Sequence, residues 1–326
     1  MPFAPPAADR RPHTIERHGR TIDDTYAWLR DEDWQRVMRE PDELKPDIRA
    51  HLEAENTWTE RALAPIAALR EELAAELKAR MKEDDFSVPT PDGDWAYYRR
   101  FVEGGQYPLL CRRPTEDPDA TREQVLLDGD AEAEGESFFS VGAAAHSPDH
   151  RMFATAIDRN GSEYCKIGIR DLETGDMLAD ELTDAQGDMV WSADGRVIFY
   201  TVLDDNHRPC RVMRHTIGTV SSEDVTVYEE SDPGFFLGIG KTESGRFVVI
   251  DAHDHADTTE VRLIPADEPA EAPRLLMARE TGVTYDVSDN GETLIIRTNR
   301  DAVDFRIASA PLDDPDPANW TDLVPH

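Results

Sequence analysis

Two histidines alternate with aspartates in the segment Asp251-Ala-His253-Asp-His255-Ala-Asp257. Imidazole and carboxylate groups at this spacing could bind a divalent metal ion. No further set of well-spaced ligands in the sequence supports such a site. A polar hairpin tip accounts for the same residues and is the favoured interpretation. We therefore predict no metal site in this chain.

Two pairs of adjacent carboxylates, Asp84-Asp85 and Asp204-Asp205, could act as a general acid and a general base. Pairs of this kind are common in a chain that carries 68 acidic residues. Exposed charge is therefore the favoured interpretation of both pairs.

A serine nucleophile of an α/β-hydrolase stands on a strand-to-helix elbow with the pattern G-x-S-x-G. The sequence contains no such pentapeptide. The nearest strings, Gly135-Glu-Ser137 and Asn160-Gly-Ser162, lack the second glycine and fall in a predicted linker and a predicted hairpin turn. The chain after residue 86 also lacks the alternation of strands and helices that an α/β sheet needs. We expect no catalytic residue and no cofactor site in this chain.

The three cysteines, Cys111, Cys165 and Cys210, are far apart in the sequence. None is accompanied by another cysteine or a histidine at the spacing of a metal site. We expect reduced, structural thiols.

Turn-forming clusters recur along the chain at intervals of 57, 45, 50 and 46 residues, and each precedes a strand-like run. A period of about 40 to 50 residues is typical of β-propeller blades. The sequence predicts five blade-sized units, with an exposed acidic insertion from Asp117 to Glu136 lengthening the first interval. The clusters are Thr90-Pro-Asp-Gly93, Ser147-Pro-Asp149, Ser192-Ala-Asp-Gly195, Thr242-Glu-Ser-Gly245 and Ser288-Asp-Asn-Gly291.

Apolar residues alternate with polar ones from about residue 86 onward, which predicts strands. The clearest hairpin has Asn160-Gly161 between two such runs, because this dipeptide favours a two-residue turn. Paired aromatic residues lie on these strand patterns and are predicted to pack the sheets rather than to stack on a ligand. They are Tyr97, Tyr98, Phe138, Phe139, Phe199, Tyr200, Phe235 and Phe236.

A helical region precedes the strands. Six apolar residues recur at spacings of 3 and 4, which places them on one face of a helix. Pro65 predicts a break or a first-turn proline near the start of this stripe, and a continuous helix from about Ile66 to Lys82. A stripe of this kind packs on a partner, and the strands that follow offer no obvious one. Its residues are Leu63, Ile66, Leu69, Leu73, Leu77 and Met81.

The change of pattern divides the chain into a helical extension, residues 1–85, and a propeller, residues 86–326. The fold class expected is therefore mainly β, an incomplete β-propeller preceded by an α-helical segment. The terminal segment Trp320 to His326 predicts a strand that stops before its partner.

The charge is strongly negative, with 68 acidic against 35 basic residues and a net charge of -33. Nucleic acid and anionic membrane surfaces are therefore poor partners. Only five of the basic residues are lysines. Adaptation to a salt-rich interior and an ordinary acidic protein from an arginine-preferring genome both fit this composition. The sequence has no apolar run long enough to span a membrane and no apolar leader, so a cytoplasmic location is expected.

Several segments together resemble the prolyl oligopeptidase family of serine peptidases, and within it oligopeptidase B. They occur in the family's order over nearly the whole chain, and the ordered set is more specific than any one segment. The segments are Asp24-Thr-Tyr26-Ala-Trp28-Leu29-Arg-Asp31, Leu52-Glu-Ala-Glu55-Asn56, Arg80-Met-Lys-Glu-Asp-Asp85, Asp158-Arg-Asn-Gly161-Ser-Glu163-Tyr164, Trp191-Ser-Ala-Asp194-Gly195, Phe199-Tyr200-Thr201, Arg208-Pro209, Arg214-His215-Thr-Ile-Gly218-Thr219, Tyr285-Asp286-Val287 and Ile296-Arg297-Thr298-Asn299.

The resemblance implies a serine endopeptidase that hydrolyses short peptides after arginine or lysine. It also implies a seven-bladed propeller that covers the active site and a C-terminal α/β-hydrolase domain that carries the catalytic serine, aspartate and histidine. Those residues would lie beyond residue 326, so none can be assigned to a position here. The missing hydrolase domain would be the partner of the apolar stripe.

Five blade-sized units instead of seven favour a fragment of a longer peptidase that is inactive by itself. The alternative is a free-standing propeller that acts as a binding module. A reading frame that continues into two more blades and a serine elbow would exclude this alternative.

Overall fold

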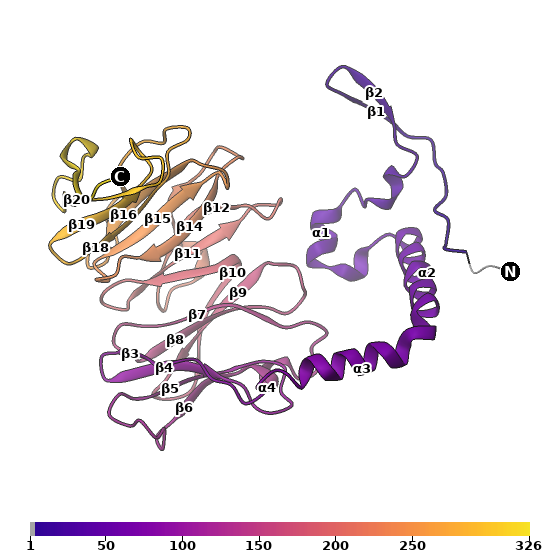
Figure 1. Ribbon diagram of the computed structural model, residues 1–326, viewed down its shortest axis with the longest axis horizontal. Helices are drawn as coiled ribbons and strands as arrows, with labels where there is room; N and C mark the ends of the chain where they lie inside the picture. Colours follow the sequence, from indigo (N-terminus) through magenta and orange to yellow (C-terminus); the bar gives the residue numbers. More distant parts are fainter. Residues whose placement is uncertain (1–3) are drawn as a thin grey trace. The chain divides into compact units, whose positions relative to one another are not determined.

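The computed structural model describes residues 4–326, and most of its regular structure is antiparallel β-sheet (Figure 1). The chain divides into two compact units, one up to Glu134 and one from Gly135 to His326. The helical elements between Ala27 and Lys78 all precede the sheet of the first unit, whose first strand begins at Thr90. The boundary between a helical extension and a propeller at residues 85 and 86 stays a prediction.

The first unit begins with a short hairpin, β1 (Thr14–Arg17) and β2 (Arg20–Asp23). Its turn residues, His18 and Gly19, have φ angles of 52° and 70°, the left-handed conformation that a two-residue hairpin turn requires. Three short helical elements follow: η1 (Ala27–Leu29), α1 (Trp34–Arg39) and η2 (Pro41–Glu43).

Two longer helices come next, α2 (Pro46–Leu63) and α3 (Ala67–Lys78), separated by the 3-10 turn η3 (Ala64–Ile66). The break that Pro65 predicted is therefore confirmed. The predicted end at Lys82 is wrong, because the backbone N–H groups of Arg80 and Met81 bond to carbonyls only three residues back. Such bonds tighten the chain into a final turn and end the helix at Lys78.

The sheet of the first unit contains four antiparallel strands in sequence order: β3 (Thr90–Asp92), β4 (Trp95–Arg100), β5 (Leu109–Pro114) and β6 (Gln124–Asp128). A short helix, α4 (Gly129–Ala133), follows β6. The prediction of an exposed insertion from Asp117 to Glu136 is thus wrong. This stretch supplies the fourth strand, with the side chains of Leu126 and Leu127 buried.

The second unit opens with a seven-stranded sheet that joins two blade-sized units through one shared strand. Residues Met177–Leu182 and Ala185 of β10 pair with β9, and Ala185–Trp191 pair with β11. Positive φ angles at Asp184 (58°) and Gly187 (131°) accompany the shift of register between the two halves. The strands are β7 (Ser140–His146), β8 (Met152–Asp158), β9 (Cys165–Asp171), β10 (Met177–Trp191), β11 (Val197–Leu203), β12 (Pro209–Thr216) and β13 (Val225–Glu229).

Two four-stranded antiparallel sheets complete the second unit, each in sequence order. The terminal strand β21 pairs with β20, so the expectation that this segment lacks a partner is wrong. The short helical elements are η4 (Ser221–Glu223) and η5 (Pro317–Asn319). The strands are β14 (Phe236–Lys241), β15 (Phe247–His253), β16 (Thr259–Pro265), β17 (Arg274–Leu275), β18 (Tyr285–Asp289), β19 (Thr293–Thr298), β20 (Arg306–Pro311) and β21 (Thr321–Val324).

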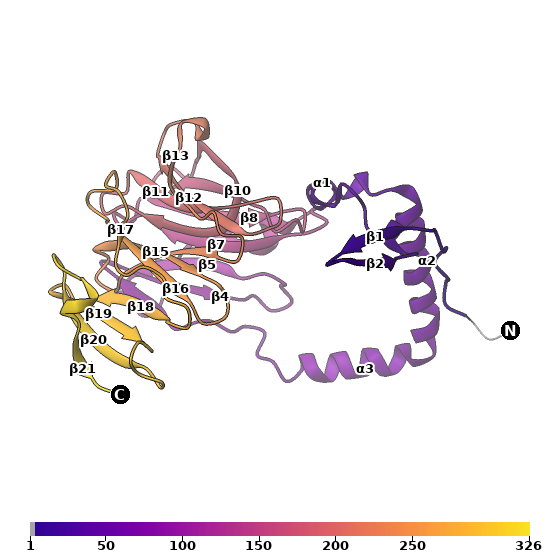
Figure 2. The same ribbon diagram turned by 90° about the horizontal axis from the view of Figure 1, so that it is seen from above.

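Apolar side chains join successive sheets of the second unit, which appear as layers in Figure 2. Phe199 and Val212 of the seven-stranded sheet share a buried cluster with Ile250 of the next sheet. Leu263 of that sheet packs in another cluster with Ile296 of the last sheet. The three sheets of the second unit therefore bury faces against one another, as propeller blades do.

The turn clusters that revealed the repeat form hairpin corners in the structure. At Ser192, which is fully buried, the hydroxyl donates to Asp194 Oδ1 at 2.7 Å and accepts the N–H of Val197 at 3.0 Å. The hydroxyl of Ser147 makes the same two bonds, to Asp149 and from Met152. A serine two residues before an aspartate thus caps the turn that reverses the chain.

Acidic side chains crowd the surface closely enough to interact. A hydrogen bond from the neighbouring Glu271 carboxyl raises the pKa of Glu268 above its ordinary value. We expect the midpoint of thermal unfolding to rise between low and molar KCl, because mobile ions screen such like charges. The measurement is circular dichroism at increasing KCl, and an unchanged midpoint would contradict salt adaptation.

Candidate functional site

One face of α3 is apolar and exposed. Leu69, Leu73 and Leu77 have relative exposures of 52%, 48% and 61%, and no residue of α3 is buried. Isolated helices of this length are marginal in water and gain most of their stability by packing an apolar face. Five of the six residues of the predicted stripe, from Ile66 to Met81, are therefore exposed, while Leu63 at the end of α2 is half-buried.

A shallow hollow lies along this face, lined by Arg70, Glu71, Leu73, Ala74 and Leu77 together with Ala67. Charged side chains flank the apolar residues, and Lys78 pairs with Glu83 at 3.4 Å. A rim of charge around exposed leucines is typical of a surface that binds another protein surface. We refer to Ile66, Leu69, Leu73, Leu77 and Met81 as the α3 face.

Asp204 is held as a fixed anion rather than as a proton donor. Burial would raise the pKa of this carboxyl, but backbone N–H groups of Arg208 and Asn206 and the Arg208 guanidinium outweigh it and lower the pKa. The guanidinium Nε lies 3.1 Å from Asp204 Oδ2. Asp84 belongs to the first unit, where its carboxylate lies 3.9 Å from Lys82 Nζ and is mostly exposed. The structure gives neither acid a catalytic setting.

Asp254, His255 and Asp257 lie in a polar hairpin tip, as predicted, while Asp251 and His253 belong to the end of strand β15. Strand β15 ends at His253 and β16 begins at Thr259, so the residues between them are the loop. Asp254 Oδ1 accepts the backbone N–H groups of Ala256, Asp257 and Thr258, and these bonds lower its pKa. Within residues 4–326, this tip does not bring three ligand atoms to metal-binding distance.

The two serines nearest to an elbow pattern do not resemble nucleophiles. Ser162 is buried, and its hydroxyl lies 3.3 Å from Asp158 Oδ1 while it accepts the N–H of Tyr164. Ser137 is an exposed residue of the segment that precedes β7. No described histidine is bonded to either hydroxyl, so neither serine has the base that activates such a nucleophile.

The three cysteines are free and buried, as expected of structural thiols. Burial raises the pKa of Cys111 and of Cys165 to about 11, and it raises that of Cys210 as well. A thiol of raised pKa is a poor nucleophile.

Sequence reasoning missed a buried polar cluster in the second unit. His215 on β12 is fully buried, and its Nε2 lies 2.8 Å from Asp180 and its Nδ1 2.6 Å from Asp224. The hydroxyl of Tyr200 donates to Asp224, and the backbone N–H of Gly218 donates to Asp180. Asp224 and Asp180 lie 9 and 35 positions from His215 in the sequence, so no local spacing indicated the cluster.

A second missed cluster joins Arg279 to two buried glutamates. Its guanidinium Nη2 lies 2.5 Å from Glu230 and 3.3 Å from Glu260, and the group stacks on the ring of Phe235 at 3.8 Å. Burial of Glu230 and Glu260 would raise the pKa of both carboxyls. Hydrogen bonds, above all from Arg279, outweigh this and keep both pKa values low. Both clusters tie separate segments of the sheets to one another.

No helix among residues 4–326 combines the length and the apolar character needed to cross a membrane.

The unclosed sheets and the preceding helices define an incomplete β-propeller with an N-terminal helical segment, as the sequence predicted. A family model described as "Prolyl oligopeptidase, N-terminal beta-propeller domain" matches residues 5–326. The chain belongs to this family, whose members are serine peptidases.

Three similar proteins support the resemblance to oligopeptidase B. Dipeptidyl aminopeptidase BI of Pseudoxanthomonas mexicana is 38% identical over 338 residues, 99% of this chain and 45% of that protein. Protease 2 of Moraxella lacunata is 32% identical over 315 residues, 95% of this chain and 44% of that protein. The structure of oligopeptidase B from Leishmania major matches with a TM-score of 0.90 and 30% identity, over 99% of this chain and 46% of that one. The chain spans less than half the length of these relatives.

Proposed function

We propose that residues 1–326 form the helical extension (1–85) and part of the propeller (86–326) of an oligopeptidase B-like serine endopeptidase. The whole enzyme would hydrolyse short peptides after arginine or lysine through an acyl-enzyme. The propeller would restrict access to the active site and exclude folded proteins. The site residues would belong to an α/β-hydrolase domain outside this chain, so residues 1–326 alone would be inactive.

The observation that carries this proposal is the exposed α3 face. A row of five large apolar side chains, each at least 45% exposed, is unusual on a surface that faces only water. The row requires an apolar partner, and relatives more than twice as long as this chain supply room for one. The preference for basic residues rests on the resemblance to oligopeptidase B alone.

The test uses the product of the complete reading frame that contains these residues. We expect it to cleave an N-blocked arginine amide, to lose this activity with a serine-directed inhibitor, and to cleave the matching proline amide poorly. Residues 1–326 purified alone should leave both substrates intact. Cleavage of the arginine amide by residues 1–326 with the same sensitivity to the inhibitor would refute the proposal.

A second candidate is removal of N-terminal dipeptides, which the name of the relative at 38% identity favours. The two activities differ in their need for a free amino terminus. A dipeptidyl arginine substrate with a free amine should be cleaved much faster than its blocked form if the enzyme is a dipeptidyl aminopeptidase. Equal rates would favour the endopeptidase.

A free-standing propeller that binds a partner without catalysis is the remaining alternative. Sequencing the DNA downstream of codon 326 decides between this binding module and the peptidase, since a frame that ends there excludes a hydrolase domain in the same product. A frame that continues into a G-x-S-x-G segment supports the peptidase. For the peptidase we propose a cytoplasmic location.

The α3 face provides a prediction in two contexts. Replacing both Leu73 and Leu77 with glutamine should change the free energy of unfolding of residues 1–326 by no more than about 0.5 kcal/mol, because both side chains are exposed there and glutamine suits a helix. In the complete product the same two substitutions should lower the free energy of unfolding by about 3 to 5 kcal/mol, if both side chains are buried against the hydrolase domain. Urea unfolding of the four proteins measures this, and equal losses in both contexts would contradict the docking.

A further inference from the structure

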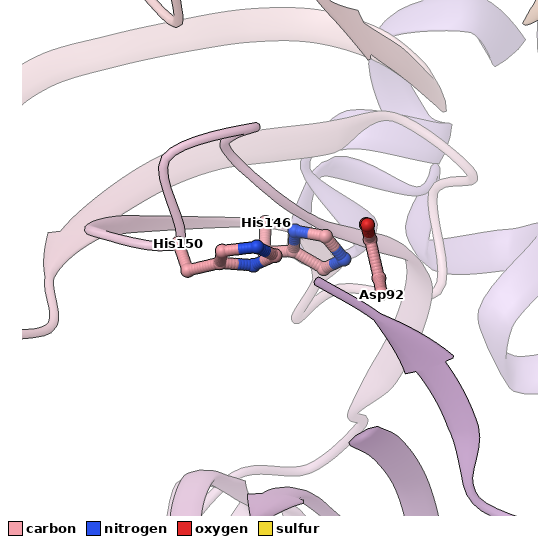
Figure 3. A group of neighbouring side chains, drawn as sticks. All are labelled: Asp92, His146 and His150. Atoms are coloured by element: carbon pink, nitrogen blue, oxygen red, sulfur yellow. The ribbon is translucent and has the colours of Figure 1, made fainter. Parts of the chain in front are cut away.

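Polar side chains of the second unit commonly lie against one another. Figure 3 shows this for His146 and His150, whose ring centroids are 5.1 Å apart. Arg279 likewise bonds two buried glutamates. Two arginines of the hairpin between β19 and β20 differ, because Arg300 and Arg306 keep hydrogen-bond donors that no residue between 4 and 326 accepts.

The guanidinium of Arg300 has no hydrogen-bond acceptor in the described part of the chain. Its closest carboxylate oxygen, Glu280 Oε2, lies 3.8 Å from Nε, which is too far for a hydrogen bond. The backbone N–H of Arg300 donates to Thr298 Oγ1 at 3.1 Å, so the main chain is anchored at this point. The side chain therefore leaves its planar set of five N–H groups open to a ligand, in a chain with 68 acidic and only 35 basic residues.

Arg306, the first residue of β20, is only partly satisfied. Its Nη1 lies 2.6 Å from Asp322 Oδ1, and this ion pair ties the side chain to the neighbouring strand β21. Its Nε is enclosed by protein and has no hydrogen-bond partner within residues 4–326. One carboxylate oxygen therefore meets only part of the donor capacity of this guanidinium. The group is held in position and still has donors to offer.

Both arginines line one open cavity of about 810 Å³ within the second unit. A cavity of this size falls in the range of sites that bind small molecules. The segment between β17 and β18, the β19–β20 hairpin and η5 form its wall. We refer to it as the arginine cavity. Its charged residues are Arg279, Glu280, Arg300, Asp301, Arg306 and Asp316.

The arginine cavity offers an acceptor as well as donors. Asp301 is exposed, and its carboxylate makes no hydrogen bond or ion pair with a described residue. The other two acids of the cavity are engaged: Asp316 Oδ1 accepts the N–H of Ala318 at 2.8 Å, and Glu280 lies beside Arg300. Open N–H donors and one open carboxylate therefore share a single cavity.

We propose that the arginine cavity binds a small zwitterion with a free carboxylate, an amino acid or a short peptide. The carboxylate lies between the guanidinium groups of Arg300 and Arg306, whose paired N–H groups match its two oxygens. The ammonium group faces the carboxylate of Asp301. A ligand that is only anionic, such as phosphate, is attracted by the arginines but repelled by the three acids of the cavity. The proposal does not depend on the proposed enzymatic function.

Calorimetric titration of residues 1–326 at low KCl tests this proposal with dialanine as the probe. We expect one dialanine to bind per chain. Its C-terminal amide and its N-acetyl derivative each lack one of the two charges, so each should bind about 10-fold more weakly or worse. Inorganic phosphate should also bind more weakly than dialanine. Alanine as a second probe identifies the source of the carboxylate: equal affinity indicates a free amino acid, weaker binding indicates a peptide, and both support the proposal.

Matched variants locate the binding. Arg300→Gln removes an open guanidinium from the cavity and should weaken dialanine binding by about 10-fold or more. Arg297→Gln is the control, because Arg297 lies on the same hairpin, pairs with Asp286 at 3.0 Å and is not part of the cavity wall. The φ angle of Asp301 is 57°, and asparagine tolerates this conformation. Asp301→Asn should weaken the binding of dialanine but not that of N-acetyl-dialanine. Circular dichroism confirms that each variant is folded.

Four results would overturn the proposal: no binding of dialanine by the unmodified chain, equal affinity for dialanine and its amide, unchanged affinity in Arg300→Gln, or an equal loss in Arg297→Gln. Phosphate that binds more tightly than dialanine would overturn the assignment to a zwitterion. If Arg300→Gln does not fold, Asp301→Asn still tests the site, because an equal loss for dialanine and N-acetyl-dialanine would contradict the proposed orientation of the ligand.

Discussion

His215→Ala is expected to lower the free energy of unfolding by about 3 to 5 kcal/mol, a large part of the stability of a domain. Asp180 and Asp224 have side-chain exposures of 3% and 1%, and each bonds to one nitrogen of this ring. Removal of the ring leaves two buried carboxyl groups facing a cavity without this hydrogen-bonding partner, which is why the loss of stability exceeds that of a single lost hydrogen bond.

Urea unfolding of the purified variant measures this loss, with His255→Ala as the exposed control. Asp224→Asn keeps the shape and a hydrogen-bonding group but removes one charge, so it should cost less than His215→Ala. A loss below about 1 kcal/mol for His215→Ala would show that the cluster contributes little beyond packing.

Arg279→Gln is expected to lower the free energy of unfolding by about 2 to 4 kcal/mol at neutral pH. The arginine supplies charge-assisted hydrogen bonds to Glu230 and Glu260, whose side chains are 5% and 7% exposed. Arg262 also bonds to Glu260, and Tyr228 to Glu230, so part of the support remains. Arg279→Lys keeps the charge but not the planar fork, and an intermediate loss is expected.

The loss in Arg279→Gln should depend on pH in a defined direction. In the unmodified chain both glutamates have pKa values below the ordinary value of about 4.5, so their contribution is present above that pH and is lost as the pH falls through the folded values. Without Arg279 the buried carboxylates destabilise the fold where they are ionised. The difference between the two proteins should therefore be largest above about pH 6 and shrink toward pH 4. A difference that stays constant or grows on acidification would contradict this account.

The repeat was predictable because its signals are local. A serine or threonine followed by aspartate or glycine closes a turn with its own side chain, as at Ser192, and alternation marks the strands on either side. Pro65 likewise predicted the position of the break between α2 and α3 to within a few residues. Such features require no knowledge of the rest of the fold.

The features that sequence reasoning missed depend on contacts between distant segments. Asp180 and His215 meet only because strands of one sheet bring together residues 35 positions apart. Strand β6 was overlooked because its apolar core is just Val125-Leu126-Leu127 within acidic surroundings.

The shared strand β10 has a consequence for how the second unit comes apart. Propeller blades usually behave as neighbours with separate internal stability, so that one can open while the next stays closed. The fifteen continuous residues of β10 belong to two blade-sized units at once. Asp180, in the half of β10 that pairs with β9, is also hydrogen-bonded to His215 on β12. Amide hydrogens from Ser140 to Glu229 should therefore exchange with solvent through one common opening event, while those of β18–β21 exchange through another. Native-state hydrogen exchange would then reveal one cooperative block from Ser140 to Glu229, where the sequence repeat shows two blades.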